Sequence, residues 1–225
     1  MGYGPTTTLS GYVSGPTLAL GLNGPTWSAG VAVALAAGEG HTCAILDNGD
    51  LKCWGGGGSG QLGTGNSYTN VFSPPATAID LGTGRTAVAV SAGGYNTCAI
   101  LDNGDLKCWG ADDFGALGDG GTNTYTNTPT AIDLGTGRTA VAVSVGKFHT
   151  CTILDNGDMK CWGRDNQGQL GDGGSNTDQG SPVSVSGSNS WDTTTTLVTW
   201  ETHPALPAGM SISAGTISGT PSVYA

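Results

Sequence analysis

The chain has 225 residues, and its 17 acidic residues against seven Lys and Arg give a formal net charge of −10. Only 11% of the residues are charged, whereas 41 are glycine; an ordinary soluble domain has roughly 25% charged residues and about 7% glycine. Because Glu, Lys and Arg normally cover helix surfaces, their scarcity excludes a mostly helical protein and predicts an all-β one. The few cations disfavour nucleic-acid binding, and no apolar run approaches the roughly 18 residues of a membrane span.

The first 30 residues differ in composition from the rest. Gly-Pro-Thr occurs at residues 4–6, 15–17 and 24–26, with short apolar runs between the copies. Proline at this spacing opposes a continuous helix and favours extended segments. We therefore expect residues 1–30 to form a β arm rich in Gly, Pro and Thr.

Three copies of one pattern fill residues 31–187. The first reads AGEGHTCAILDNGDLKCWG at 37–55, and its counterparts follow after 55 and then 53 residues. From Thr77 and Thr130 onward, the second and third copies agree at 28 of 34 positions. A repeat of this fidelity indicates one structural unit used three times.

Each copy predicts antiparallel strands, because Asn-Gly between two apolar runs is a strong hairpin signal. In the second copy we expect strands at residues 87–90, 97–101, 105–109 and 131–134. Four-stranded units repeated every 40–55 residues or so are typical of β-propeller blades. The predicted fold is all-β, with three four-stranded antiparallel blades in an incomplete ring, at about residues 31–76, 77–129 and 130–187.

The six cysteines occupy the same two positions in every copy. A three-residue loop, Asp47 to Gly49, with Gly49 in the left-handed conformation, places Cys43 directly opposite Cys53. Directly opposed Cβ atoms lie about 4.5–5.5 Å apart and can close to disulfide range. This register predicts three disulfides within hairpins: Cys43–Cys53, Cys98–Cys108 and Cys151–Cys161.

Zinc ligation and free thiols are the alternatives for these cysteines. Structural zinc sites usually use pairs two to four residues apart, whereas these pairs are ten apart. Disulfides persist in oxidising compartments, so we expect an extracellular or cell-surface protein.

The pattern HTCAILDNGDLKCWG followed by GQLG resembles the regulator of chromosome condensation type repeat, in its secreted microbial, cysteine-containing form. The resemblance covers roughly residues 31–187 and implies a β-propeller. It also implies three sets of equivalent residues: the turn glycines Gly49, Gly104 and Gly157, the blade tryptophans Trp54, Trp109 and Trp162, and closing loops at 60–63, 115–118 and 168–171.

Propellers of that family usually have about seven blades, within a general range of four to eight, whereas three copies occur here. Blades with open edges invite pairing with another chain. We therefore expect either a fragment of a longer protein or a subunit that completes its sheet by assembling.

Residues 203–223, HPALPAGMSISAGTISGTPSV, resemble the middle of an immunoglobulin-like repeat found in large microbial surface proteins. The resemblance implies a short strand after LPAG and a turn at GTISGTP. We expect residues 188–225 to be a partial immunoglobulin-like β segment.

No motif in the chain indicates catalysis. A nucleophile elbow, a P-loop and a dinucleotide fingerprint are all missing from the sequence, so we expect no enzymatic activity and no cofactor. The three Asp-Asn-Gly-Asp turns are either turn chemistry or weak calcium sites. Asp112 and Asp113, with Asp119 nearby, are the somewhat better cation candidates.

Positions where the copies differ are candidates for recognition, since binding residues often lie on loops of a rigid scaffold. In the loop before the first cysteine, the differing residues are His41 in the first copy, Tyr95 and Asn96 in the second, and Phe148 and His149 in the third. In the loop after the tryptophan of the second copy, they are Asp112, Asp113 and Phe114. Neutral drift of exposed loops is the alternative. The three tryptophans either pack between blades or form a stripe for glycan contact.

These observations predict a non-enzymatic extracellular structural or adhesive protein. Its strand edges and termini would pair with further copies or with another surface protein by strand addition, so that the chain forms a fibre subunit. The alternative is a secreted module that binds a protein partner through its blade loops, like an inhibitor of this fold. Nucleotide exchange on a small GTPase, the activity of nuclear family members, fits the acidic charge and the cysteines less well.

Overall fold

The computed structural model describes residues 30–66, 69–122, 124–174, 176–187, 210–213 and 216–219. The chain divides into two compact units, residues 1–186 and 187–225. The predicted N-terminal arm, apart from residue 30, and most of the predicted immunoglobulin-like segment lie outside the described residues.

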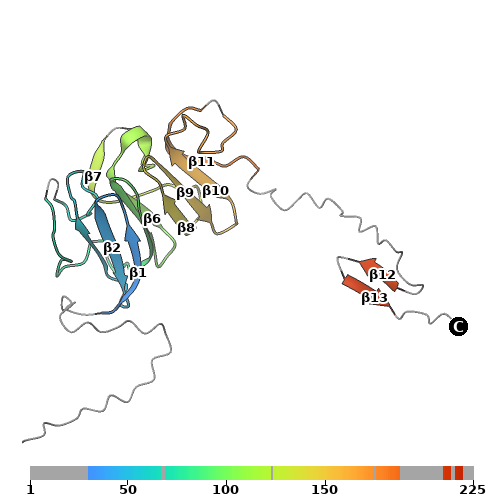
Figure 1. The fold of residues 1–225 in the computed structure, drawn as a ribbon, viewed down its shortest axis with the longest axis horizontal. Helices are drawn as coiled ribbons and strands as arrows, with labels where there is room; N and C mark the ends of the chain where they lie inside the picture. The colour runs from blue at the N-terminus through green and yellow to red at the C-terminus, as the bar shows by residue number, and fades with distance from the viewer. Residues whose placement is uncertain are drawn as a thin grey trace, which may run out of the picture. The chain divides into compact units, whose positions relative to one another are not determined.

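The first unit is all-β and consists of three antiparallel sheets, called blades 1, 2 and 3 in chain order (Figure 1). In each blade, strands that follow one another in sequence are hydrogen-bonded neighbours. Blade 1 contains β1 (Ala32–Ala37), β2 (His41–Leu46) and β3 (Leu51–Gly55); blade 2 contains β4 (Ala87–Ala92), β5 (Asn96–Leu101), β6 (Leu106–Ala111) and β7 (Tyr125–Ala131); blade 3 contains β8 (Ala140–Val145), β9 (His149–Leu154), β10 (Met159–Gly163) and β11 (Gln179–Ser184).

The fourth strand lies earlier than the predicted 131–134. In blade 2 it is β7, which begins at Tyr125 and pairs with β6. Pro129 is tolerated there because β7 is an edge strand, where a missing N–H costs no ladder hydrogen bond. The chain then turns at Asp133, whose carboxylate accepts a hydrogen bond from the Gly135 amide at 2.8 Å. The predicted second unit ends at residue 129, which lies inside β7. The blade in the structure therefore extends beyond the end of the predicted unit.

Blade 1 differs from the four-stranded prediction. Its described residues contain three strands, and an isolated bridge between Gly55 and Val71 stands where the fourth strand lies in the other two blades. The equivalent pairs are Gly110 with Thr126 in blade 2 and Gly163 with Gln179 in blade 3.

The central hairpins have the predicted register. Cys43 pairs with Cys53, and the Leu46 amide donates to the Asp50 carbonyl at 2.9 Å across a loop whose Gly49 has φ +81°. Disulfides join Cys43–Cys53, Cys98–Cys108 and Cys151–Cys161. The Asn48 side chain stabilises the turn, because its Oδ1 accepts a hydrogen bond from the Asp50 amide at 3.0 Å.

Consecutive blades are joined by two apolar clusters. One runs from blade 1 into Trp109 of blade 2, and the other runs from blade 2 into Trp162 of blade 3. Both indoles are fully buried, and each Nε1–H donates to a backbone carbonyl of the preceding blade: Trp109 to Gln61 at 2.9 Å, and Trp162 to Ala116 at 3.0 Å. Burial on this scale excludes stacking of a glycan on Trp109 or Trp162.

The second unit is described only as a hairpin. Strand β12 (Met210–Ser213) pairs antiparallel with β13 (Thr216–Gly219), with Ile212 opposite Ile217. Among the described residues of the chain, no helix has the length and apolar character that a membrane crossing requires.

Candidate functional site

In each blade a loop precedes the second strand, and these three loops meet at one end of the first unit. The Glu39 amide donates to the Gly93 carbonyl at 3.1 Å, and the Glu39 carboxylate forms an ion pair with Lys147 Nζ at 3.3 Å. These contacts connect blade 1 with blades 2 and 3. A shallow hollow of about 370 Å³ lies among them, lined mainly by glycine and alanine. The structure therefore brings together the loops that the sequence marks as variable.

Not all of the variable residues face solvent. His41 and Asn96 are 4% and 1% exposed and lie inside the molecule. His41 Nε2 is 2.8 Å from Thr97 Oγ1 of blade 2, and burial lowers the pKa of His41 to about 4. His149 at the equivalent position of blade 3 is half-buried. Of the predicted loop residues before the cysteines, Tyr95 is the most accessible, at 39% exposed, and Phe148 is half-buried like His149.

An aromatic and cationic cluster bridges blades 2 and 3. The rings of Phe114 and Phe148 meet edge to face, with centroids 5.3 Å apart. The guanidinium carbon of Arg164 lies 4.6 Å from the Phe114 centroid and 5.7 Å from that of Phe148, and Lys147 Nζ lies 5.5 Å from the Phe148 centroid. Cations at such distances are attracted by the electron-rich faces of aromatic rings.

Phe114 has a left-handed backbone, φ +62°, which few non-glycine residues adopt. A single substitution in the repeat explains it. In blades 1 and 3 a glutamine side chain, Gln61 or Gln169, accepts a hydrogen bond from the amide two residues earlier, at 2.8 and 2.7 Å. Blade 2 has Ala116 at this position, which cannot do so, and the loop instead forms a short 3₁₀ turn, η1 (Asp113–Gly115).

Asp112 supports this turn from inside. It is fully buried, its Oδ1 accepts from the Leu117 amide at 3.0 Å, and its Oδ2 lies 3.5 Å from Thr124 Oγ1. Burial raises the pKa of Asp112 to about 6, the Leu117 hydrogen bond opposes this shift, and the negative charge of Asp119 adds to it. Asp165 performs the same bracing in blade 3, accepting from Leu170 at 2.9 Å.

The acidic residues do not gather into a cation site in the described part of the chain, where no group of three or more His, Cys, Asp or Glu could hold a metal ion. Asp113 and Asp119, the other two cation candidates, are exposed. In the Asp-Asn-Gly-Asp turns, the first aspartate accepts from a backbone amide 16 residues earlier, as Asp102 does from Thr86 at 3.1 Å. Asp102 also pairs with Arg85 at 3.2 Å. These contacts are turn and loop chemistry.

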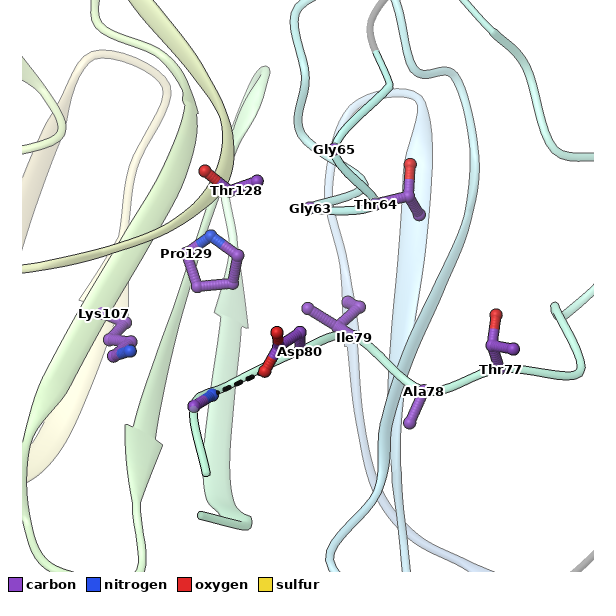
Figure 2. Close-up of a pocket in the computed structure, with 11 residues that line it drawn as sticks. Gly63, Thr64, Gly65, Thr77, Ala78, Ile79, Asp80, Lys107, Thr128 and Pro129 are labelled. Atoms are coloured by element: carbon purple, nitrogen blue, oxygen red, sulfur yellow. Dashed lines mark hydrogen bonds between the residues drawn. The ribbon is translucent and has the colours of Figure 1, made fainter. Parts of the chain in front are cut away.

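A pocket of about 490 Å³ lies between blades 1 and 2 (Figure 2). Its wall includes Thr77 to Asp80 on one side and Lys107, Thr128 and Pro129 on the other. The charged groups are already engaged: Lys107 Nζ donates to the Leu81 carbonyl at 3.0 Å, and Asp80 accepts from the Gly82 amide at 2.8 Å. The lining holds no paired acid and base and no activated nucleophile.

Sequence reasoning identified the two phenylalanines but missed the cations beside them. Arg164 follows the Trp-Gly pair, where the other copies have Gly56 and Ala111. Lys147 precedes Phe148, at the position where the other copies have Glu39 and Gly94. The signal was present, because these positions also differ between otherwise similar copies. What the sequence lacked was the placement of blade 2's Phe114 against blade 3.

Family comparison agrees with this geometry. Two models of the regulator of chromosome condensation (RCC1) repeat match the chain, one at residues 32–61, 87–116 and 140–169, the other at 48–100 and 103–153. Together they span residues 32–169, more than half of the chain.

Curated relatives share the repeats. The human E3 ubiquitin-protein ligase HERC2 is 30% identical over 149 residues, which cover 66% of this chain and 3% of HERC2. The ultraviolet-B receptor UVR8 of Arabidopsis thaliana is 31% identical over 139 residues, covering 62% of this chain and 31% of the receptor. The chain thus spans less than a third of the length of these relatives.

Solved structures agree in fold. The yeast RCC1 protein Prp20, in its crystal structure with Kap60, matches with a TM-score of 0.61 and 22% identity, covering 68% of this chain and 37% of Prp20. Matched repeats, register and blade architecture lead to one conclusion: the chain belongs to the RCC1 repeat family and carries three of its propeller-type blades.

Proposed function

We propose that this chain is a non-enzymatic, extracellular protein-binding module. The binding region is the loop surface, defined here as Glu39, Tyr95, Phe114, Lys147, Phe148 and Arg164. Three disulfides favour an oxidising, extracellular location. The pocket between blades 1 and 2 contains no catalytic combination of residues, which favours recognition over chemistry.

The observation that carries the proposal is the environment of Arg164. Its guanidinium is held against two phenylalanine rings, and it makes no ion pair with a carboxylate in the described residues. By contrast, Arg85, Arg138 and Lys147 each pair with an acidic side chain. Lys52 and Lys107 also lack an ion pair with a carboxylate in the described residues, but each donates to a backbone carbonyl, whereas Arg164 is held against two aromatic rings. Arginine and aromatic residues are the types enriched at interaction hot spots.

The chemistry of the surface indicates the chemistry of the partner. Arg164, flanked by aromatic rings, offers planar donors that suit a carboxylate in a two-pronged geometry. The rings of Phe114 and Phe148 add apolar area beside it. A protein segment that presents an acidic side chain next to an apolar one would satisfy both features.

The disulfide-locked hairpins would keep this surface in place. The backbone of Arg164 is fixed to the neighbouring loop, since its amide donates to the Phe148 carbonyl at 2.8 Å. A surface organised before binding loses less conformational entropy when the partner arrives. Partner binding is also known within the family: Prp20 has been crystallised bound to Kap60.

The test is a binding experiment on the oxidised full chain against arrayed random peptides, read by biolayer interferometry. Wild-type protein is expected to select acidic peptides with an adjacent apolar residue. Arg164→Gln and the double variant Tyr95→Ala/Phe148→Ala should each weaken binding at least about tenfold, the loss of a typical hot-spot contact. The matched control Arg138→Gln, at the opposite end of blade 3, should bind as wild type. Equal binding by Arg164→Gln and wild type would refute the proposal.

A structural role through self-assembly is the second candidate. It is favoured by a different observation: Phe72, which follows the bridge between Gly55 and Val71 in blade 1, is a large apolar side chain that is 93% exposed. The hairpin β12–β13, within the segment that resembles an immunoglobulin-like repeat, would suit a surface protein built of several β domains.

A further inference from the structure

The three loops that form the loop surface share one backbone arrangement but differ in charge. Each loop has two residues, enclosed by a glycine amide that donates to a carbonyl three residues later: Gly38 to His41, Gly93 to Asn96 and Gly146 to His149, at 2.8–2.9 Å. The first of the two loop residues is Glu39 in blade 1, Gly94 in blade 2 and Lys147 in blade 3. Equivalent positions of the three blades are therefore acidic, neutral and basic.

Glycine in blade 2 allows the charged residues of blades 1 and 3 to meet. A Cβ on Gly94 would lie 3.1 Å from Lys147 Cγ and 3.2 Å from the Lys147 carbonyl oxygen, closer than an ordinary van der Waals contact. With no side chain at Gly94, the Glu39 carboxylate reaches Lys147 Nζ at 3.3 Å. All three residues line the shallow hollow between the loops. The ion pair thus joins blade 1 to blade 3 across the loop of blade 2.

This ion pair is held less firmly than the two Arg–Asp pairs of the chain. The Lys147 and Glu39 side chains are 56% and 48% exposed, whereas those of the Arg–Asp pairs are 36–37% exposed. The aspartates of those pairs, Asp102 and Asp155, also accept a hydrogen bond from a backbone amide. The Glu39 carboxylate has no second contact of this kind in the described part of the chain. Because exposed ion pairs contribute little to stability, another carboxylate can replace Glu39 at small cost.

Two cations approach the same aromatic ring. Lys147 Nζ lies 5.5 Å from the Phe148 centroid, and the guanidinium carbon of Arg164 lies 5.7 Å from it. Two of the seven Lys and Arg residues of an acidic chain therefore flank one phenylalanine. Like charges repel each other, so that this arrangement favours anions beside both cations. Glu39 supplies one anion, and no described carboxylate pairs with Arg164.

We propose that the loop surface binds a protein segment with two acidic side chains and an apolar one between them, and that the second carboxylate replaces Glu39 on Lys147. The first carboxylate pairs with Arg164, and the apolar side chain packs on the Phe114 and Phe148 rings. Glu39 is then a built-in competitor, which neutralises Lys147 in the free protein and is released to water on binding. The inference rests on the protein-binding function proposed above and adds a second acidic group to the partner.

Competition by Glu39 has a measurable consequence for specificity. In wild type, the second acidic group of a partner gains an ion pair with Lys147 while Glu39 loses one, so the net gain in affinity is small. Without Glu39, the second acidic group gains the full ion pair. Without Lys147, it gains nothing. The preference for two acidic groups over one should therefore depend on Glu39 and Lys147 together.

The test measures peptide binding by the oxidised full chain with biolayer interferometry. One peptide has a glutamate on each side of a leucine, either adjacent to it or one serine away, and two matched peptides have glutamine in place of one glutamate. Wild type should prefer the doubly acidic peptide by less than about twofold. Glu39→Gln should prefer it by about two- to fivefold, the contribution of one exposed ion pair. The double variant Glu39→Gln/Lys147→Gln should show no preference.

A matched variant separates this competition from the change in net charge. Asp102→Asn also removes one negative charge from an exposed ion pair, and it keeps an acceptor for the Thr86 amide. Asp102 follows β5, at the end opposite the Tyr95 loop. Asp102→Asn should therefore bind all three peptides as wild type does. Thermal melts of every variant check that these exposed substitutions leave the fold intact.

Two results would overturn the inference: the same preference in Glu39→Gln as in wild type, or a preference that persists when Lys147 is replaced. Singly acidic peptides test the underlying function separately, because their binding should depend on Arg164 and leave Glu39 in place. If they bind wild type and lose affinity with Arg164→Gln, a failure of the Glu39 variants refutes only the competition. If wild type binds no acidic peptide, the proposed function fails and this inference fails with it.

Discussion

Residues 42–55 and 97–110 have identical sequences, TCAILDNGDLKCWG, yet they lie in different environments. Both form the same disulfide-bonded hairpin with the same register. Trp109, however, is fully buried against blade 1, whereas Trp54 is half-buried. Thr97 is fully buried and Thr42 is not. The hairpin conformation is thus a property of the segment, and the burial of its side chains is a property of the neighbouring blade.

The comparison separates two sources of stability in the first unit. Disulfides and turns act within one hairpin and should contribute equally to both copies. Indole burial acts between blades and should differ between them. Mutations made in pairs at equivalent positions measure the two sources against each other.

The largest expected effect is the contrast between Trp109→Ala and Trp54→Ala. Removing a fully buried tryptophan typically costs about 3–5 kcal/mol, and here it also leaves the Gln61 carbonyl with one donor fewer. Trp54→Ala should cost less than about half as much, because the indole is already partly in water. Guanidinium unfolding of the oxidised variants measures both. Equal losses would show that Trp54 is covered as well as Trp109.

Removal of a disulfide should have the opposite pattern. Replacing Cys98 and Cys108 by Ser should cost about 2–3 kcal/mol, since the bond closes a short loop in the unfolded chain. The equivalent pair Cys43 and Cys53 should cost the same within error, because loop length and burial are alike. Unfolding midpoints under identical conditions test this. A large difference between the two pairs would contradict the local origin of the effect.

A pH series should reveal two opposing groups. The pKa of His41 is about 4 in the folded state and near 6.5 unfolded, so the free energy of unfolding falls as pH drops through this window. The pKa of Asp112 is about 6 folded and near 3.8 unfolded, so the free energy falls as pH rises from 3.8 to 6. Between pH 4 and 6 the two partly cancel.

Replacing one of the two residues should reveal the pH dependence that is due to the other. His41→Asn, which places the blade 2 residue in blade 1, leaves the effect of Asp112, so the free energy of unfolding should fall with rising pH relative to wild type. Asp112→Asn, which keeps an acceptor for the Leu117 amide, should make the protein less stable with falling pH. Each change should be on the order of 2 kcal/mol across the window. Thermal melts at pH 4, 5, 6 and 7 are the measurement, and parallel profiles for all three proteins would contradict the assignment.

The smallest expected effect is that of Ala116→Gln. The new side chain would accept from the Phe114 amide, as Gln61 does from Ser59, and allow Phe114 to leave its left-handed conformation. The gain should be about 0.5–1 kcal/mol, the size of one hydrogen bond. The aromatic cluster should loosen at the same time, so acidic-peptide binding should weaken. A more stable variant with unchanged binding would show that the turn at Phe114 does not shape the surface.

Much of the fold could be predicted because it is local. Asn-Gly turns, alternation of apolar residues and the cysteine spacing specify each hairpin and its register without reference to the rest of the chain. The fourth strand was misplaced because Ile132 and Leu134 are apolar for another reason: they are buried in a connection between blades, 7% and 4% exposed. A run of apolar residues indicates that a segment is buried, but a buried segment can be a connection between blades as well as a strand.

The candidate site was predicted less completely. Variation between copies indicated Phe114 and Phe148, but His41 and Asn96 vary equally and lie inside the molecule. A difference between copies shows that a position need not have the same residue in every blade. It does not show whether that position lies in an exposed loop or in an interface between blades.

By itself, therefore, the sequence determined the all-β class through its composition and the three repeats through their self-similarity. It also determined the hairpin register and the disulfide pairs, since both depend on residues within about a dozen positions of one another. Only the tertiary structure decided which of two identical hairpins buries its tryptophan fully, how Arg164 meets two rings from different blades, and which of the variable loop residues lie inside the molecule. These features depend on contacts between segments some 50 residues apart, and such contacts are set by how whole blades pack.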